Sequence, residues 1–226
     1  MRTTRRDFFV LLLGAAGARA GLAAPARRTV RIGLALGEGS AVARGATLAA
    51  EEARRTGDLL GVVFELRTPG PGAAAVVGLS TPKNPPAVLF LTAGAIDGPS
   101  PVDPRIFHVA SSPRRRKEAL ARAGKGVRVV DWHPDLVRYG AEQLNQRFHQ
   151  RFGRPMDEAA WRGWMAVKAV AEAALRSPGG DLAATLATLR FDGHKGKPLE
   201  FDPQDHHLRQ PVYLVDGRGR LIGEAG

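Results

Sequence analysis

The stretch Thr29-Val-Arg-Ile-Gly-Leu-Ala-Leu36 opens the unit that decides the fold. Its β-branched and apolar residues predict a buried strand that ends in a glycine-rich turn. Ser40 follows as a candidate N-cap for an alanine-rich helix over 41–56, because its hydroxyl can accept a hydrogen bond from a free amide of the first turn. A second strand is predicted over 62–66. A strand, a helix and a strand in this order form a βαβ unit, which predicts a parallel sheet.

The rest of the chain adds further elements of both kinds. Residues 69–86 are rich in proline and glycine, although 73–79 could form a short helix. Beyond them we expect strands over 87–91, 106–110 and 127–130, helices over 113–123, 134–152 and 157–176, a short helix capped by Asp181, and a terminal β element over 199–222. The fold class is therefore α/β.

The helix predicted over 157–176 has two distinct faces. Apolar residues, among them Trp164, recur at helical spacing on one face. The opposite face carries charges of alternating sign in steps of four, which predicts a solvent-exposed face. Its members are Glu158, Arg162, Lys168, Glu172 and Arg176.

Residues 1–26 have the composition of an export signal. Arg5-Arg6 stands before the apolar run 8–18, and Ala18-Arg19-Ala20 and Ala24-Pro25-Ala26 are candidate cleavage sites. The adjacent arginines favour a twin-arginine signal, which exports folded proteins. A membrane anchor is the alternative, but this run is well short of the roughly 20 residues that cross a bilayer. We therefore expect a periplasmic protein whose mature part, 27–226, has no stable membrane span.

Composition argues against several functions. The chain has no cysteine, which excludes disulfides, thiolate nucleophiles and cysteine metal sites. The net charge is +11, yet the one dense basic run, 114–117, contains no aromatic residue, so we expect no nucleic-acid binding. A solvated helix face accounts for this run, and a patch for anionic ligands or lipid headgroups is the alternative.

The sequence contains no convincing catalytic or cofactor motif. Gly37-x-Gly39 after the first strand lacks the third glycine of a dinucleotide loop, since Val42 stands there. Asp205-His206-His207, with His194 and Asp202 nearby, fits a polar loop better than a metal site. The serines at 80, 100, 111, 112 and 177 lie outside any G-x-S-x-G pattern. We therefore expect no enzyme, no cofactor and no metal.

Four segments carry a family resemblance. In chain order they are 153–161, 164–174, 191–201 and 208–213. They resemble the C-terminal part of type I periplasmic solute-binding proteins of the branched-chain amino acid-binding group, which serves ABC importers. More narrowly, they and segments 107–114 and 145–148 resemble the subgroup associated with alcohol oxidation dependent on pyrroloquinoline quinone (PQQ).

The resemblance implies a three-layer parallel-sheet lobe and a second lobe joined to it by crossing segments. Family members are longer, so this chain is expected to be a condensed form whose second lobe is largely missing. The main lobe would comprise 27–112 and 134–198, and the remnant of the second lobe 113–133 and 199–226.

The resemblance also places a ligand at the carboxyl ends of the first-lobe strands, where open parallel sheets generally bind ligands. The residues concerned are Ser40, Thr92, Ala93, Gly94, Ser111 and Ser112, and Trp161 is a candidate to stack on a ligand. The alternative is that Ser40 and Ser112 only cap helices and that Trp161 belongs to the core.

The function implied is the periplasmic substrate-binding component of an ABC importer. Its ligand would be an amino acid or small organic solute, its partner an ABC permease, and its context PQQ-dependent alcohol oxidation. The alternative is a non-transporting accessory or scaffold protein of a periplasmic quinoprotein dehydrogenase. An open pocket with Thr92 and Ser111 pointing into it would favour solute binding, whereas a filled pocket beside an exposed apolar patch would favour the accessory role.

Overall fold

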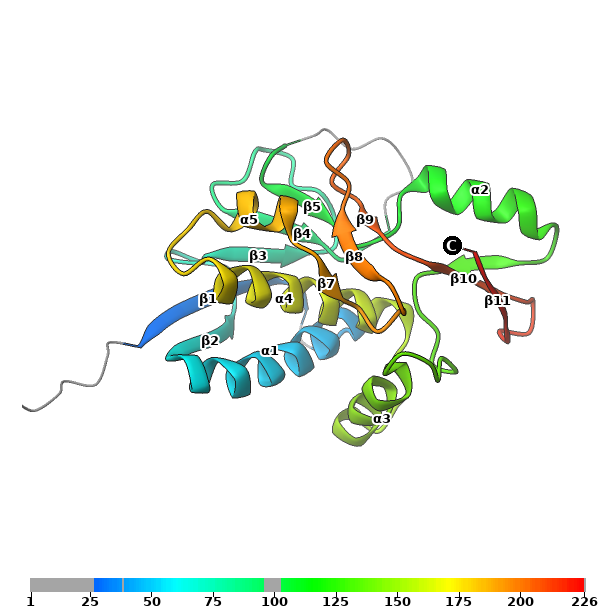
Figure 1. Ribbon diagram of the computed structural model, residues 1–226, viewed down its shortest axis with the longest axis horizontal. Helices are drawn as coiled ribbons and strands as arrows, with labels where there is room; N and C mark the ends of the chain where they lie inside the picture. Colours follow the sequence, from blue (N-terminus) through cyan, green and yellow to red (C-terminus); the bar gives the residue numbers. More distant parts are fainter. Residues whose placement is uncertain (1–26, 38, 96–102, 226) are drawn as a thin grey trace, which may run out of the picture.

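A five-stranded parallel sheet forms the centre of the molecule (Figure 1). The computed structural model describes residues 27–37, 39–95 and 103–225, so the predicted leader lies outside the described residues. The strands are β2 (Val62–Arg67), β1 (Arg28–Ala35), β3 (Ala75–Gly78), β4 (Leu89–Thr92) and β5 (Ile106–His108), in this spatial order. The predicted βαβ unit and the α/β fold class are confirmed.

Strand β3 corrects one expectation, because residues 73–79 do not form a helix. Ala75-Val-Val-Gly78 pairs with β1 on one side and with β4 on the other. Its two β-branched valines fit a central strand better than a helix, since they are restricted at χ1 against a helical turn. Residues 69–74 need only turn the chain before it enters the sheet.

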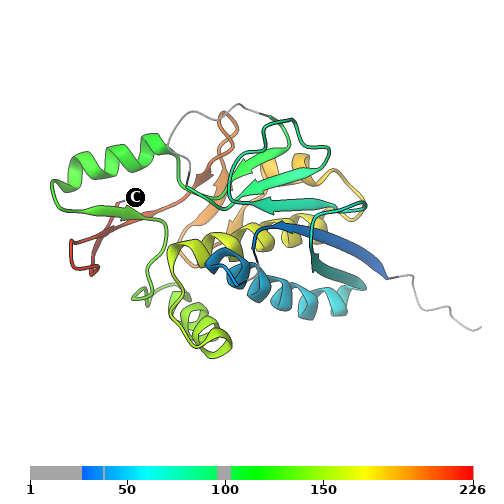
Figure 2. The same cartoon turned by 180° about the vertical axis from the view of Figure 1, so that it is seen from behind.

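Helices cover one face of this sheet. They are α1 (Ala41–Leu60), α4 (Glu158–Arg176) and α5 (Leu182–Thr188). Figure 2 shows the sheet from its other side. Arg31, Val76 and Phe90 alternate with buried neighbours along their strands and are partly or fully exposed. The connections from β3 to β4 and from β4 to β5 contain no helix in their described residues, which explains why the second helical layer is reduced.

The core depends on a close approach of α1 to α4. A Cβ added at Gly45 would lie 1.8 Å from the Ala160 carbonyl oxygen, and one added at Gly163 would lie 2.1 Å from that of Val42. Glycine at both positions lets the two backbones touch. The amino ends of both helices are thereby fixed beside the carboxyl edge of the sheet (Figure 1).

A smaller lobe lies beyond the carboxyl edge of the sheet (Figure 1). Helix α2 (Pro113–Ala123) packs on an antiparallel sheet of β6 (Arg128–Val130), β10 (Val212–Val215) and β11 (Leu221–Ala225). Its core is small: Ala119, Val129 and Val212 form one cluster. Three crossing segments, 109–112, 131–140 and 210–211, connect this small lobe to the main lobe.

The segment after α5 belongs to the main core in this structure. It contains β7 (Phe191–Asp192), β8 (Pro198–Phe201) and β9 (Leu208–Arg209). Leu199, Phe201 and Leu208 are buried in the main cluster. We therefore propose that the boundary between the lobes lies near residue 210 and not at 198.

Helix α3 (Ala141–Phe152) begins later than the sequence predicts, so the helix expected from residue 134 is wrong in its first seven positions. Gly140 has a left-handed backbone conformation, with φ of 83°. Residues 134–140 form turns instead, and the Asn145 Nδ2 amide donates to the carbonyls of Pro134 and Leu136 at 2.7 and 3.2 Å.

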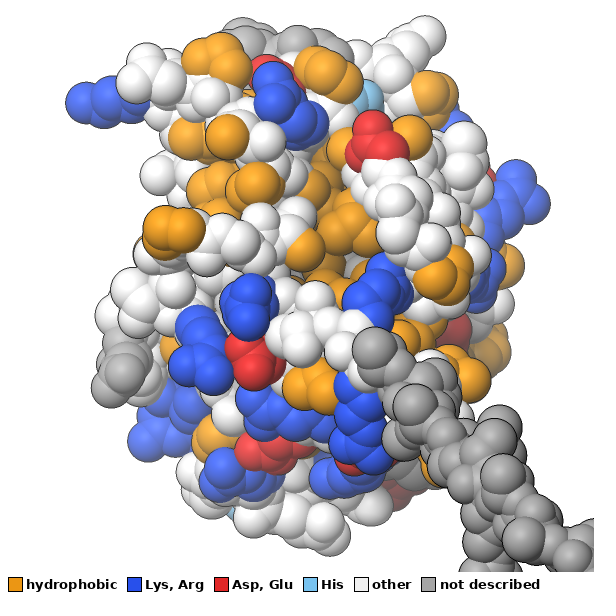
Figure 3. Space-filling view, turned by 90° about the vertical axis from the view of Figure 1, so that its left-hand side faces the viewer, with side chains coloured by type: hydrophobic (Ala, Val, Ile, Leu, Met, Phe, Trp, Pro, Cys, Tyr) orange, Lys and Arg blue, Asp and Glu red, His pale blue; other side chains and the backbone are white. Residues whose placement is uncertain are grey.

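Figure 3 shows the end of the molecule where the parallel strands begin. Hydrophobic side chains gather in a hollow there, and Lys and Arg side chains lie below it. A cavity of about 410 Å³ at this end is lined by residues before β3 and β4 and at the start of α5. None of the helices in the described residues combines the length and hydropathy of a membrane span.

Candidate functional site

Thr92 ends β4 at the carboxyl edge of the sheet, where it is buried. Its Oγ1 shares a hydrogen bond of 2.9 Å with Nδ1 of His108. Burial, with smaller effects of His207 and His206, lowers the pKa of His108 to about 3, so that ring is neutral near pH 7. The Thr92 hydroxyl is therefore engaged within the protein.

Ala93 and Gly94 continue the same edge. The Ala93 amide donates to the Gly78 carbonyl at 2.8 Å, which extends the pairing of β3 with β4. A Cβ added at Gly94 would lie 2.0 Å from the Leu79 carbonyl oxygen. Only glycine fits this contact, so these two residues hold the strand ends together.

Ser40 and Ser112 begin helices, as the capping interpretation predicts. The Ser40 Oγ accepts from the Ala43 amide at 3.1 Å, at the start of α1. The Ser112 Oγ accepts from the Arg115 amide at 3.4 Å, at the start of α2. Ser112 also lines a surface cavity described below.

Ser111 points into the buried contact region between the two lobes, which we call the junction and which also contains Asp131, Arg162, Trp161 and Lys195. Its hydroxyl donates to Asp131 Oδ1 at 2.6 Å, and its amide donates to the same carboxylate. Asp131 follows β6 directly and is fully buried. Thus the first and second crossing segments are linked by a buried, charge-assisted hydrogen bond.

Arg162 is the main ionic partner of Asp131. Its Nε donates to Asp131 Oδ2 at 2.8 Å, and its terminal nitrogen donates to Glu158 at 2.5 Å. Arg116 of α2 contacts both carboxylates, at 3.6 and 3.1 Å. Burial by itself raises the pKa of Asp131, but Arg162, Lys195 and Arg116 outweigh it, so the pKa lies below its ordinary value.

The position of Arg162 corrects the expectation of a solvent-exposed face. Arg162 is only 5% exposed, although Arg176 and other charged residues further along α4 are much more accessible. The first turns of α4 lie beneath the small lobe, whereas its later turns extend along the main lobe (Figure 1). A charge pattern alone cannot distinguish these two environments.

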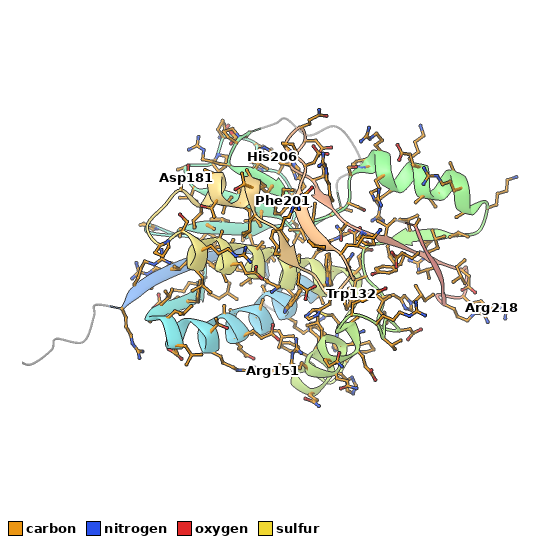
Figure 4. The ribbon with its side chains drawn as sticks, viewed as in Figure 1. Trp132, Arg151, Asp181, Phe201, His206 and Arg218 are labelled. Carbon is orange, nitrogen blue, oxygen red and sulfur yellow. The ribbon has the colours of Figure 1, made fainter. Side chains whose placement is uncertain are left out.

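Trp161 belongs to the core of the junction. Its indole is fully buried and stacks on that of Trp132, with ring centroids 5.7 Å apart and planes 8° apart. Figure 4 shows Trp132 where α4 meets the small lobe. Trp161 Nε1 has no hydrogen-bond partner among the described residues. In this structure the Trp161 ring is occupied by contacts with its own chain.

Lys195 completes the junction from the other side. Its Nζ lies 4.1 Å from the Trp161 ring centroid and donates to the Asp131 carbonyl, to Gln210 Oε1 at 2.6 Å and to the Pro211 carbonyl at 3.1 Å. Burial lowers the pKa of Lys195 to about 7, against the opposing effect of Asp131 and Glu158.

The junction therefore joins all three crossing segments through buried side chains. Gln210, which accepts from Lys195, also donates to the Val109 carbonyl at 2.8 Å. Ser111 and Trp161 were predicted as candidates from the sequence, whereas Asp131, Arg162 and Lys195 were not. An aspartate directly after a buried strand was the one available signal, because strand ends are where an α/β sheet places its polar groups.

Two cavities flank the junction. The α2 cavity, of about 370 Å³, lies between the start of α2 and residues 197–211, and has charged walls that include Arg114, Lys197 and Glu200. The hairpin cavity, of about 340 Å³, lies between residues 135–141 and the β10–β11 hairpin. Thr92, Ser111 and Trp161 line neither cavity. Within the described residues, no three side chains of the types that bind metals converge on one point.

The sequence of residues 72–220 matches the sequence model of the periplasmic binding protein family. This range includes most of the main lobe after β2, both sides of the junction and most of the small lobe. The chain belongs to the periplasmic binding protein family. Its α/β architecture matches a lobe of a type I periplasmic binding protein. A comparison with curated protein sequences gives no significant match.

Solved structures of solute-binding proteins share the fold. A leucine-, isoleucine-, valine-, threonine- and alanine-binding protein from Brucella ovis, in a closed conformation, aligns with a TM-score of 0.62 at 11% identity, over 84% of this chain and 90% of that one. The substrate-binding protein LivJ from Streptococcus pneumoniae, in complex with isoleucine, gives 0.58 at 14% identity, over 87% and 99%. A solute-binding protein from R. palustris, in complex with benzoate, gives 0.54 at 11% identity, over 88% and 95%.

Proposed function

We propose that this chain is the solute-binding component of an ABC importer for an amino acid or small organic solute. The observation that carries the proposal is the presence of two lobes joined by three crossing segments, the architecture in which two-lobed binding proteins close around a ligand. Family membership supports it, as do the structural neighbours bound to isoleucine and benzoate. The partner would be an ABC permease, and no nucleic acid is involved.

We also propose that the protein reaches the periplasm by a twin-arginine signal and serves a PQQ-dependent alcohol-oxidation system. The first part rests on Arg5-Arg6 and the apolar run that follows. The second rests on the resemblance of segments 107–114 and 191–201 to that subgroup.

Ligand contact at the strand ends would require an exchange of bonds. The Thr92 hydroxyl would have to leave His108, and the Ser111 hydroxyl would have to leave Asp131. We propose that these residues, with Ser40, Ala93, Gly94, Ser112 and Trp161, contact the solute in a form whose lobes have separated.

The accessory role is the second candidate, and a specific observation favours it. The junction is filled by the protein's own side chains, and exposed apolar residues lie beside it at Val137, Tyr139 and Ile222. A family fold that has lost solute transport and binds a periplasmic quinoprotein dehydrogenase would show these features.

A thermal-shift screen of the purified protein distinguishes the two candidates. The solutes are amino acids, short-chain alcohols, their acids and aromatic acids. A ligand that binds only the folded state raises the melting temperature as its concentration rises. A saturable rise with one chemical class supports the solute-binding proposal. A cooperative melt that no class shifts would refute it and favour the accessory role, which co-purification with the dehydrogenase would then test.

A further inference from the structure

The hairpin cavity has the size and lining of a small-molecule site. Its volume of about 340 Å³ lies at the lower end of the range for ligand pockets. Its walls are mostly apolar, and none of the strand-end residues lines it. The apolar lining comes from Leu136, Val137, Ala141, Leu221 and Ile222.

Uncovered apolar side chains concentrate at this cavity. Of the seven large hydrophobic residues that are exposed in the described chain, three line it: Val137 at 66%, Tyr139 at 61% and Ile222 at 53%. Contiguous exposed apolar surface is unfavourable in water and usually marks a binding site.

Tyr213 supplies a polar group to the wall of the cavity. This residue of β10 is 4% exposed and lines the cavity. Its ring lies near the Lys195 ammonium, and its hydroxyl is the polar group that this residue offers at the cavity wall. A molecule in the cavity can form a hydrogen bond with this hydroxyl.

The cavity rim is held in an unfavourable backbone conformation. Tyr139 and His194 both have left-handed backbones, with φ of 58° and 60°, and the His194 ring lies 3.2 Å from the Tyr139 carbonyl oxygen. A Cβ at Gly140 would lie 2.6 Å from the His194 ring, and one at Gly196 would lie 2.5 Å from the Tyr139 ring. The two turns are thus locked together, and such strain in non-glycine residues concentrates at functional sites.

The charges at the rim select the ligand. Asp135 and Glu224 contribute two carboxylates to the lining, and Arg138 contributes one guanidinium. Glu224 also lies close enough to Tyr213 to help burial raise the pKa of that phenol. A carboxylate ligand would be repelled here, whereas a hydroxyl group can donate to Glu224 and accept from Tyr213, and an amino group can donate to Glu224.

We propose that the hairpin cavity binds a compact apolar molecule that carries one hydroxyl or amino group and no negative charge. This site goes beyond the proposed function, because it lies apart from the strand ends and needs no separation of the lobes. Apolar contact with Val137 and Ile222 would hold the body of the molecule, and Tyr213 and Glu224 its polar group.

Methyl NMR of the full chain tests the proposal, with benzyl alcohol as the probe. The chain has four isoleucines, of which Ile222 lines the cavity, while Ile32 and Ile106 are buried in the main sheet. We expect the Ile222 methyl signal, assigned with Ile222→Val, to shift saturably while the signals of Ile32 and Ile106 stay in place. Benzoate, which has the same ring and a negative charge, should leave all of these signals unmoved.

Variants distinguish binding of benzyl alcohol in the hairpin cavity from non-specific hydrophobic binding. Tyr213→Phe keeps the ring and should weaken benzyl alcohol binding roughly threefold to tenfold, the effect of one hydrogen bond. Val137→Ser should weaken it too, whereas the matched exposed variant Leu59→Ser, on α1, should not. An Ile222 signal that does not move, or moves equally with benzoate, would overturn the proposal. Because the Ile222 signal reports on this cavity and not on the strand ends, its failure to move with benzyl alcohol would leave the proposed function intact.

Discussion

Replacing Asp131 with asparagine tests the buried junction most sharply. The substitution keeps the shape of the side chain but removes its charge and one acceptor. Asp131 bonds to Arg162 at 2.8 Å and to Ser111 at 2.6 Å, with Arg116 at 3.6 Å. All of these contacts cross from one segment of the junction to another.

The expected loss in the free energy of unfolding follows from the burial of Asp131 and Arg162. Asp131 is fully buried and Arg162 is 5% exposed. The variant therefore leaves a buried guanidinium whose one remaining anionic partner, among the residues that the structure describes, is Glu158. Breaking a buried ion pair by removing one partner costs about 3–5 kcal/mol of the free energy of unfolding. A domain has roughly 5–15 kcal/mol in total, and at about 2–4 °C per kcal/mol the melting temperature should fall by roughly 6–20 °C.

Urea unfolding followed by tryptophan fluorescence measures this loss, because Trp132 is adjacent to Asp131 in the chain and stacks on Trp161. The matched control is Asp58→Asn, which removes an exposed carboxylate 3.7 Å from Arg27 and should leave the unfolding midpoint unchanged. A loss below about 1 kcal/mol for Asp131→Asn would refute the reasoning, since it would mean that water reaches the junction.

Three further predictions concern other parts of the structure. Burial lowers the pKa of Lys195 from 10.5 to about 7, so between these pH values the unfolded chain binds more protons than the folded chain. Urea titrations should therefore show the free energy of unfolding rising over this pH range by up to about 1.4 kcal/mol per pH unit. Lys195→Met should abolish this rise. Gly163→Ala should cost about 1–3 kcal/mol in the same assay, because the new Cβ would meet backbone 2.1 Å away, whereas Gly37→Ala enters open space and should be neutral. Thr92→Val should cost about 1–3 kcal/mol by leaving the His108 ring without its partner, and an unchanged melting temperature would argue against that buried hydrogen bond.

The sequence predicts most of the main lobe because its signals are local. The strand–helix–strand unit over 29–66, the Ser40 and Ser112 caps and the helix that starts after Asp157 all depend on residues near one another in the chain. Strand β3 was missed since it has only four residues and takes its stability from β1 and β4, which lie elsewhere in the sequence.

The junction could not be predicted in the same way. Asp131, Arg162 and Lys195 come from three separate segments, and nothing in the spacing of charges on α4 indicates that its first turns lie under a second lobe. The resemblance identified Thr92, Ser111 and Trp161 as residues of interest. Their internal partners depend on tertiary packing, which the sequence pattern does not reveal.

The central claim is that this chain binds a small solute, and a calorimetric titration tests it most directly. The titrant is the solute class that gives the largest thermal shift, added to the full-length protein, with Leu59→Ser as a control for non-specific adhesion. We predict saturable heat with one solute per chain and an unchanged response in the control. Heat that never saturates with any solute class, from a protein that melts cooperatively, would contradict the claim.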